Sequence, residues 1–424
     1  MRLAVVTQFV MSERTFGTAR ATKGFGVFDD HETDWTFLRT LAQMTEKGAE
    51  IGECLSAARR INERDVESWI SEWATLAERL EQDAEDALDE GHEISARELF
   101  LRAQNYYGAA EHGCSPSHPR FFEMWEKSRE CFQRACPLFD PPIEMHEVQV
   151  DNWELPAYYW RPADDNRERP TMVAVGGNDE LLEALTVFTG HAAVRRGYNY
   201  FTIDYPGHRG AVLLYDDCVK RPDYEVPFAE ILDYVEGLHG SDGRIAMAGY
   251  SFGGYVAPRV AIHDDRVDAL IANSPMIDVP KIQSGLVNPL VGRVPRPLLE
   301  RLVERRLDKS PLAKAYVEYG FYSFGEPEMT ISKWLKTDEP IGSDMVIEDD
   351  LGGITCPTLA LVGEDEGEEM IIQTEAFIEG VSTDVKDLYV FTLEEDGSDD
   401  HVQMDNWTRG QQITYDWLDG IFST

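Results

Sequence analysis

The sequence predicts an α/β fold in which a mostly parallel β-sheet carries helices on both faces. After about residue 143, short apolar segments alternate with helical stretches, as in chains that build such a sheet from βαβ units. A glycine-rich turn around a serine follows directly on one of these segments. The residues before that point show helical spacing only. We therefore expect an N-terminal helical domain, residues 1–142, and an α/β domain, residues 143–424.

The helical domain is predicted from apolar residues that recur every three or four positions. Trp69 and Trp73 belong to such a run between residues 65 and 88, and residues 95–110 repeat the pattern. Aromatic residues of this kind pack most often in the core of their own domain; the alternative is that they cover a substrate site. The segment 136–142, Cys-Pro-Leu-Phe-Asp-Pro-Pro, interrupts the helical pattern and marks the expected boundary.

The α/β domain is predicted from short segments rich in β-branched and aromatic residues, separated by helical stretches. The expected strands are residues 148–150, 157–160, 171–175, 198–204, 244–248, 269–272, 358–362 and 388–391. The connection between the strand that ends near 273 and the strand that starts near 358 is far longer than a normal crossover. We therefore expect a helical cap inserted at about residues 276–352.

The charge of the chain restricts its partners. The chain has 424 residues, of which 78 are acidic and 39 basic, for a formal net charge of −39 at pH 7. An excess this large repels nucleic acid and anionic membranes, so we expect neither as a partner. Only ten of the basic residues are lysines. This composition is typical of proteins from a cytoplasm with molar salt, and we hypothesise that salt screening stabilises the protein; the alternative is an ordinary acidic protein.

The sequence indicates neither a membrane span nor a metal centre. No apolar run reaches the roughly 18 residues that a transmembrane helix needs. Residues 1–10 contain one positive charge and no small-residue cleavage site, so we expect no signal peptide and a cytoplasmic location. The six cysteines form no Cys-x-x-Cys pair and no zinc-like set with histidine. We expect reduced thiols, no metal and no other cofactor.

The glycine-rich turn is the strongest candidate for chemistry. Gly249, Tyr250, Ser251, Phe252 and Gly253 follow an expected buried strand and lead into a helical stretch. In the α/β-hydrolase fold, a sharp strand-to-helix turn of this kind exposes a nucleophilic serine, and its glycines leave room for the strained backbone. The motif alone is common, but the strand and the helix around it make it specific. We predict that Ser251 is a nucleophile and that Tyr250 borders a substrate pocket.

A serine hydroxyl needs a base that removes its proton and an acid that orients the base. In this fold, the acid and then the histidine follow the serine along the chain. His401 lies after the last expected strand, where the base belongs, whereas His208 follows an earlier strand and is the weaker candidate. The identity of the acid stays open between the neighbours Asp365 and Glu366. The spacing from Gly363 favours Glu366, and the commoner use of the shorter side chain slightly favours Asp365.

An acyl-transfer reaction also needs two N–H donors for the oxyanion of its tetrahedral intermediate. The backbone N–H of Phe252, directly after the serine, is one candidate. The other lies in the glycine loop after the strand at 171–175, at Gly177 or Asn178. We also expect His208 to line the pocket, because it follows the end of a neighbouring strand.

With these residues placed, the chain resembles one branch of the α/β-hydrolases. That family contains 2,6-dihydroxypseudooxynicotine hydrolase, the fungal heptaketide chain-shortening hydrolase of pigment synthesis and the fermentation-respiration switch protein. The resemblance depends on Gly-Gly-Asn-Asp-Glu-Leu-Leu-Glu at 176–183, Asp-Tyr-Pro-Gly at 204–207 and Gly-Tyr-Ser-Phe-Gly-Gly at 249–254. It implies an α/β-hydrolase fold behind a helical domain, and a homodimer formed through that domain.

The resemblance also implies roles for individual residues. Ser251, His401 and one of the two acids would form a triad, and Glu183 matches a carboxylate that assists substrate handling in the family. Members of the family cleave carbon–carbon bonds next to ketones, or esters. Glu180 stands where the family often has a serine, and His208 replaces a small or amide residue. These two departures leave the choice of substrate open.

We therefore expect a hydrolase of a small carbonyl compound, either a 1,3-diketone or a carboxylic ester, that works through an acyl-enzyme. A second hypothesis is a non-catalytic binding or regulatory protein that uses the helical domain for docking. Loss of a triad member would favour that hypothesis, and none is missing. An oligopeptidase is excluded, because about 140 largely helical residues cannot form the many-stranded propeller of such enzymes.

Overall fold

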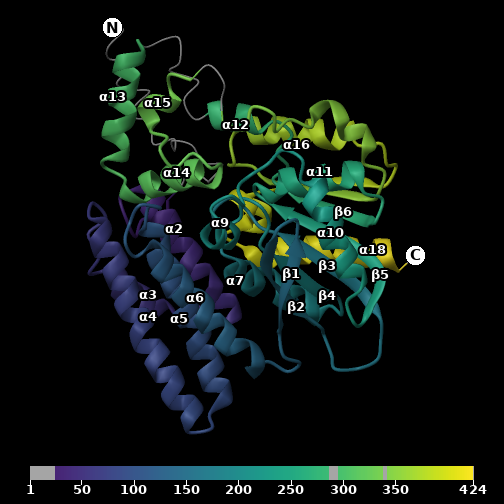
Figure 1. Ribbon diagram of the computed structural model, residues 1–424, viewed down its shortest axis with the longest axis horizontal. Helices are drawn as coiled ribbons and strands as arrows, with labels where there is room; N and C mark the ends of the chain where they lie inside the picture. Colours follow the sequence, from purple (N-terminus) through teal and green to yellow (C-terminus); the bar gives the residue numbers. More distant parts are fainter. Residues whose placement is uncertain (1–23, 286–294, 338–340, 424) are drawn as a thin grey trace.

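The computed structural model describes residues 24–285, 295–337 and 341–423. Residues 1–10, from which we expect no signal peptide, and residues 291–294 of the long connection lie outside the described residues. The described chain forms a helical N-terminal part, an eight-stranded sheet and a group of helices inserted between two strands (Figure 1). In this part of the chain, no helix is long and apolar enough to cross a membrane.

The N-terminal part is built from helices whose apolar faces meet. Within the described residues they are α2 (His31–Ala42), α3 (Ile51–Ala58), α4 (Val66–Asp89), α5 (Glu93–Gly113) and α6 (Phe121–Ala135). Asp30 and Asp65 cap α2 and α4 by accepting a backbone N–H of the first turn. The ring centroids of Trp69 and Trp73 are 5.7 Å apart, and those of Trp73 and Tyr106 are 5.3 Å apart. These buried aromatic residues therefore pack in the helical core rather than over a substrate site.

The sheet has the strand order β1-β2-β4-β3-β5-β6-β7-β8. Its strands are β1 (Glu144–Val150), β2 (Trp153–Trp160), β3 (Arg169–Val175), β4 (Asn199–Ile203), β5 (Ser241–Tyr250), β6 (Val267–Asn273), β7 (Thr358–Gly363) and β8 (Lys386–Phe391). β2 pairs antiparallel with β1 and β4, and the other neighbouring strands are parallel. Each expected strand segment overlaps one of these strands, and the predicted α/β fold with a mostly parallel sheet is confirmed.

Helices connect the strands and form the long insertion. The connecting helices are α7 (Leu182–Leu185), α8 (His191–Arg195), α9 (Arg209–Leu214), α10 (Glu225–Glu236), α11 (Gly253–His263) and α16 (Glu368–Gly380). Two more, α17 (Leu393–Asp396) and α18 (Trp407–Phe422), follow the last strand. The insertion between β6 and β7 holds α12 (Val279–Gly285), α13 (Arg296–Leu307), α14 (Pro311–Ser323) and α15 (Ile331–Trp334). Because α14 contacts α2 and α5, the inserted helices meet the N-terminal helices beside the sheet (Figure 1).

The two faces of the sheet belong to separate hydrophobic cores. Along β3, Val173 and Val175 pack with α10, α11 and α16, whereas Met172 and Ala174 pack with α8 and α18. The second core continues into the N-terminal helices. These helices are therefore packed onto the sheet, and the division into domains at residue 142 stays a prediction.

Candidate active site

Ser251 lies at the turn between β5 and α11, where the backbone is strained. Its φ is 56°, in the left-handed region that non-glycine residues rarely adopt. A Cβ at Gly249 would lie 2.0 Å from the carbonyl oxygen of Gly253, and a Cβ at Gly253 would lie 2.2 Å from that of Val175. The N–H of Ser251 donates to the carbonyl of Asn273 (3.0 Å), which ties the turn to β6. Glycines are therefore needed on both sides of the serine for this turn to form.

The hydroxyl of Ser251 begins a series of two hydrogen bonds. Ser251 Oγ lies 2.8 Å from His401 Nε2, and His401 Nδ1 lies 2.5 Å from Glu366 Oε2. With the carboxylate ionised, Nδ1 carries the ring proton and donates it, which leaves Nε2 as an acceptor for the serine hydroxyl. The Glu366 side chain is fully buried and that of His401 is 9% exposed. In this arrangement a histidine can remove the proton of a serine.

Three donors hold the carboxylate of Glu366. Besides the imidazole of His401, the hydroxyl of Ser274 donates to Oε2 (2.6 Å) and the N–H of Gly363 donates to Oε1 (2.7 Å). The chain turns directly after β7, with the N–H of Glu366 on the carbonyl of Gly363 (3.2 Å). This turn directs the side chain of Glu366 toward the histidine.

The slight preference for Asp365 does not agree with this geometry. Asp365 lies one residue earlier in the turn, is partly exposed and donates its backbone N–H to the carbonyl of Asp399 (3.1 Å). The carboxylate that meets His401 is that of Glu366. At a turn, a shift of one residue changes which side chain faces the sheet, so the spacing from Gly363 was a better guide than the commoner residue type.

The loop of His401 is supported by an N-terminal helix. The N–H of His401 donates to Oδ1 of the preceding Asp400 (2.7 Å). The other carboxylate oxygen of Asp400 accepts the indole N–H of Trp35, on α2 (2.8 Å), and Trp35 is buried. This contact could not be predicted, because no spacing or motif in the sequence relates Trp35 to a loop at the other end of the chain.

The glycine loop after β3 lies against the serine. A Cβ at Gly177 would lie 3.0 Å from Ser251 Cβ and 3.4 Å from Ser251 Oγ, so a side chain at this position would crowd the hydroxyl. Asn178 and Phe252 line one cavity together with Ser251. Gly177 lines the other cavity at Ser251, so the structure brings all three residues expected at an oxyanion site close to the serine.

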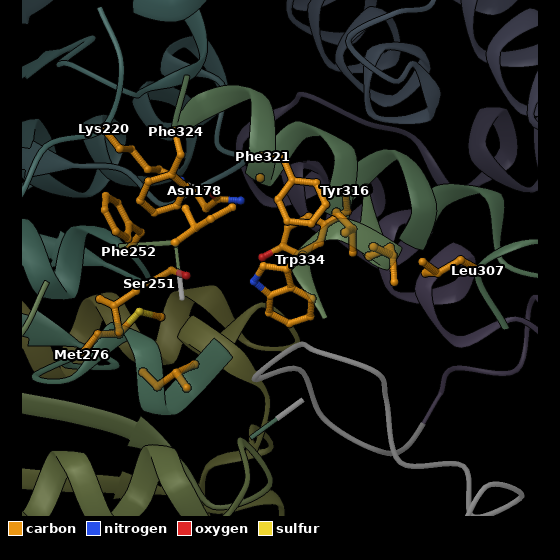
Figure 2. A pocket seen from close by; sticks show the side chains of 16 residues that line it. Asn178, Lys220, Ser251, Phe252, Met276, Leu307, Tyr316, Phe321, Phe324 and Trp334 are labelled. Carbon is orange, nitrogen blue, oxygen red and sulfur yellow. Dashed lines mark hydrogen bonds between the residues drawn. The ribbon is translucent and has the colours of Figure 1, made fainter. Parts of the chain in front are cut away.

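Two cavities meet at Ser251. The larger has a volume of about 170 Å³, is mainly apolar and extends along the inserted helices (Figure 2). The smaller, of about 80 Å³, borders His401 and Tyr250. The residues that line both are Ser251, Met276, Ile282 and Tyr316. A substrate bound here can therefore extend to either side of the serine.

Two expected pocket residues, Glu183 and His208, lie outside these cavities. Glu183 is buried and accepts the hydroxyl of Tyr158 (2.9 Å); burial and the charge of Asp204 raise its pKa to about 7. His208 is also buried, with Nδ1 hydrogen-bonded to Asp204 and its ring stacked on Tyr205. Both expectations are corrected, because the side chains of Glu183, in α7, and His208, after β4, are hydrogen-bonded in the protein interior and do not line the cavities at the serine.

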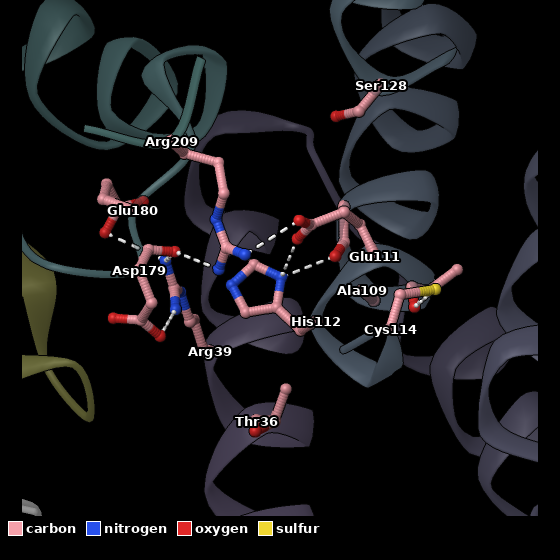
Figure 3. A network of polar contacts seen from close by, with 12 residues as sticks. Thr36, Arg39, Ala109, Glu111, His112, Cys114, Ser128, Asp179, Glu180 and Arg209 are labelled. Carbon is pink, nitrogen blue, oxygen red and sulfur yellow. Dashed lines mark hydrogen bonds and ion pairs between the residues drawn. The ribbon is translucent and has the colours of Figure 1, made fainter. Parts of the chain in front are cut away.

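A buried network of charged side chains surrounds the residues after the glycine loop (Figure 3). Arg39, on α2, pairs with Asp179 (2.7 Å) and Glu180 (3.1 Å). Arg209, on α9, pairs with Glu111 on α5 (2.9 Å), and burial raises the pKa of Glu111 to about 7 against the attraction of both arginines. Glu180, one of the two residues that depart from the resembled family, thus has a partner in an N-terminal helix. Among the described residues, no group of three or more His, Cys, Asp or Glu side chains is arranged to hold a metal ion.

The chain is similar to known hydrolases in sequence and in fold. Residues 184–391 match the model of the alpha/beta hydrolase family. Hydrolyase poxO from Penicillium oxalicum is 29% identical over 323 residues, which cover 72% of this chain and 76% of that protein. The 20-hydroxy-prefusarin hydrolase FUS2 from Gibberella moniliformis is 32% identical over 264 residues, 60% of this chain and 62% of that protein. The crystal structure of 2,6-dihydroxy-pseudo-oxynicotine hydrolase is 23% identical with a TM-score of 0.68, covering 90% of this chain and 95% of that one, and it shares the fold.

Proposed function

We propose that this hydrolase, of which residues 184–391 match the alpha/beta hydrolase family, uses Ser251 as the nucleophile against a small carbonyl compound. The observation that supports the proposal best is the hydrogen-bonded series Ser251–His401–Glu366 at the junction of two cavities. The bond cleaved is that of a carboxylic ester, or the carbon–carbon bond between the two carbonyl groups of a 1,3-diketone.

The first step forms an acyl-enzyme. Ser251 Oγ attacks the carbonyl carbon while its proton passes to His401 Nε2, and the carboxylate of Glu366 stabilises the imidazolium. The oxyanion of the tetrahedral intermediate accepts the N–H of Phe252 and one N–H of the glycine loop, at Gly177 or Asn178. Collapse of the intermediate breaks the bond to the leaving group, which receives the proton from the imidazolium.

The leaving group distinguishes the two reactions. An ester releases an alkoxide, which is protonated to an alcohol. A 1,3-diketone releases a carbon with the electron pair of the broken bond, and this carbanion is delocalised as an enolate onto the second carbonyl before protonation gives a ketone. In both reactions the histidine then deprotonates a water molecule, which attacks the acyl-enzyme and releases a carboxylic acid and the free serine.

The surroundings of the serine support a small organic substrate. The larger cavity is mainly apolar and is lined by aromatic side chains such as Phe321 and Trp334 (Figure 2). The relative FUS2 is named as a 20-hydroxy-prefusarin hydrolase. A substrate with an apolar body and a reactive carbonyl group fits both observations.

A fluorophosphonate probe tests the proposed nucleophile. We expect the wild-type protein to be labelled, the label to map to Ser251, and Ser251→Ala to remain unlabelled. Ser56→Ala, at an exposed serine of α3, serves as the control and should be labelled like the wild type. Labelling that survives in Ser251→Ala, or a folded wild-type protein that is not labelled, contradicts the proposal and favours the non-catalytic binding protein.

The same preparation separates ester from carbon–carbon cleavage. p-Nitrophenyl acetate reports ester hydrolysis, and benzoylacetone reports cleavage of a 1,3-diketone through loss of its enol absorbance. The substrate with the higher kcat/KM shows whether the protein prefers ester hydrolysis or carbon–carbon cleavage. Both activities should disappear in Ser251→Ala, because both need the acyl-enzyme.

A further inference from the structure

Lys220 is a buried lysine in the wall of the larger cavity (Figure 2). It lies in the loop between α9 and α10, and its backbone N–H donates to the carbonyl of Ser323 (2.8 Å), which fixes the loop against α14. Its ammonium group donates to Oδ1 of Asn178, in the glycine loop beside the serine. Of the described residues that line this cavity, Lys220 alone carries a charge.

The surroundings of the ammonium hold it in place without neutralising it. Nζ lies 4.6 Å from the ring centroid of Phe252 and 4.7 Å from that of Phe324. Among the described residues, its contacts are these rings and the amide of Asn178, with no carboxylate in an ion pair. Burial lowers the pKa of Lys220 to about 7, although Asp179 opposes this shift; Arg209 adds to it. A buried cation of this kind costs stability.

We propose that Lys220 binds an anionic oxygen of the substrate, a carboxylate or the enolate of an acidic enol, inside the larger cavity. An ammonium group has three N–H donors, and Asn178 takes only one of them. An anionic oxygen would supply the counter-charge that the protein does not provide, and a charge-assisted hydrogen bond in such an apolar site is strong. The inference rests on the proposed function, since it concerns the substrate of the same serine.

The position of Lys220 also restricts the size of this substrate. Lys220 and Ser251 line the same cavity of about 170 Å³, and Asn178 connects the lysine to the loop that lies against the serine. The anionic oxygen and the reactive carbonyl therefore belong to one small molecule, separated by a short spacer. The apolar remainder of that molecule would pack against the inserted helices.

A matched pair of esters tests the inference by turnover. Mono-p-nitrophenyl glutarate carries a terminal carboxylate where p-nitrophenyl pentanoate carries a methyl group. We expect Lys220→Met to lower the ratio of their kcat/KM values, anionic over neutral, by about 10- to 100-fold. Lys314→Met, at an exposed lysine of α14, should leave the ratio unchanged. If Lys220→Met lowers both kcat/KM values equally, the lysine only positions Asn178 and the inference is wrong.

A binding measurement separates this inference from the proposed function and distinguishes the two sources of the anion. In the Ser251→Ala background, calorimetry measures the affinity for two pairs of ligands. The first pair is glutarate and its neutral dimethyl ester. The second pair is cyclohexane-1,3-dione, an acidic enol, and its neutral enol methyl ether. The preferred anion should bind about tenfold more weakly when Lys220→Met is added; Lys220→Gln serves if Lys220→Met does not fold. If Lys220→Met weakens the binding of neither anion, the inference is overturned, even where the fluorophosphonate labels Ser251. Lysine-dependent binding without any labelling refutes the proposed hydrolysis instead.

Discussion

Replacing Glu366 by glutamine removes one negative charge and keeps nearly the same side-chain shape. In the native protein the carboxylate accepts His401 Nδ1 at 2.5 Å, the hydroxyl of Ser274 at 2.6 Å and the N–H of Gly363 at 2.7 Å. An amide has one oxygen and one NH₂ group, so in Glu366→Gln one of these donors would face another donor. If that donor is Nδ1, the imidazole adopts the tautomer with its proton on Nε2 and can no longer accept the proton of the serine.

The expected loss is large because the charge and the tautomer are affected together. Converting the acid of a Ser-His-Asp triad to its amide lowers kcat by about 10⁴-fold, and we expect a fall of about 10³- to 10⁴-fold for Glu366→Gln. This corresponds to about 4–5.5 kcal/mol of transition-state stabilisation. The assay is steady-state hydrolysis of p-nitrophenyl acetate, together with melting curves that confirm folding.

The neighbouring acid provides the matched control. Asp365→Asn makes the same chemical change one residue earlier, at a partly exposed side chain, and should keep kcat within about threefold of the wild type. The assignment of Glu366 would be refuted if Asp365→Asn lost as much activity as Glu366→Gln. It would also be refuted if Glu366→Gln kept more than about a tenth of the wild-type rate.

Three further predictions concern the supports of the site and the charge of the chain. Trp35→Phe removes the indole N–H that Asp400 accepts at 2.8 Å, so kcat for p-nitrophenyl acetate should fall about tenfold in a folded protein; an unchanged kcat contradicts this role. Lys220→Met should stabilise the protein, because the pKa of Lys220 falls from 10.5 to about 7 on folding. Urea unfolding of both proteins should show a gain in unfolding free energy that grows as the pH falls from 10.5 toward 7, reaches at most roughly 5 kcal/mol and is constant below; a gain that grows with rising pH contradicts the burial of a cation. Raising the KCl concentration should raise the melting temperature, since salt screens the net charge of −39, and equal stability in dilute buffer refutes the salt hypothesis.

The sheet and the serine were predictable because both depend on local patterns. Each strand is a short run of β-branched or aromatic residues whose side chains alternate between two buried faces. The turn at Ser251 needs glycine at 249 and 253 because neighbouring backbone leaves no room for a Cβ. The position of His401 beside Ser251 was predictable from its place after the last strand, since the carboxyl ends of parallel strands share one edge of the sheet.

The acid and two pocket residues depend on the direction of individual side chains, which the sequence pattern does not specify. Asp365 and Glu366 are neighbours in one turn, and the local backbone decides which of them reaches the histidine. His208 follows the end of β4, as residues of an active site commonly do, and Glu183 was expected from the family resemblance alone, yet they hydrogen-bond to Asp204 and to a buried tyrosine. Strand ends indicate where a site lies, but only the packed structure shows which side chains enter it.

Helix α2 explains why the contribution of the N-terminal helices escaped prediction. Trp35 and Arg39 are one helical turn apart and therefore lie on the same face of α2. Trp35 donates to Asp400, directly before the histidine, and Arg39 pairs with Asp179, directly after the glycine loop. One face of a single helix thus supports both loops that flank the serine. These contacts with the loops beside the serine are not expected of a domain that serves only for docking. Disrupting α2 should therefore lower the rate of hydrolysis, and not only the affinity for a partner.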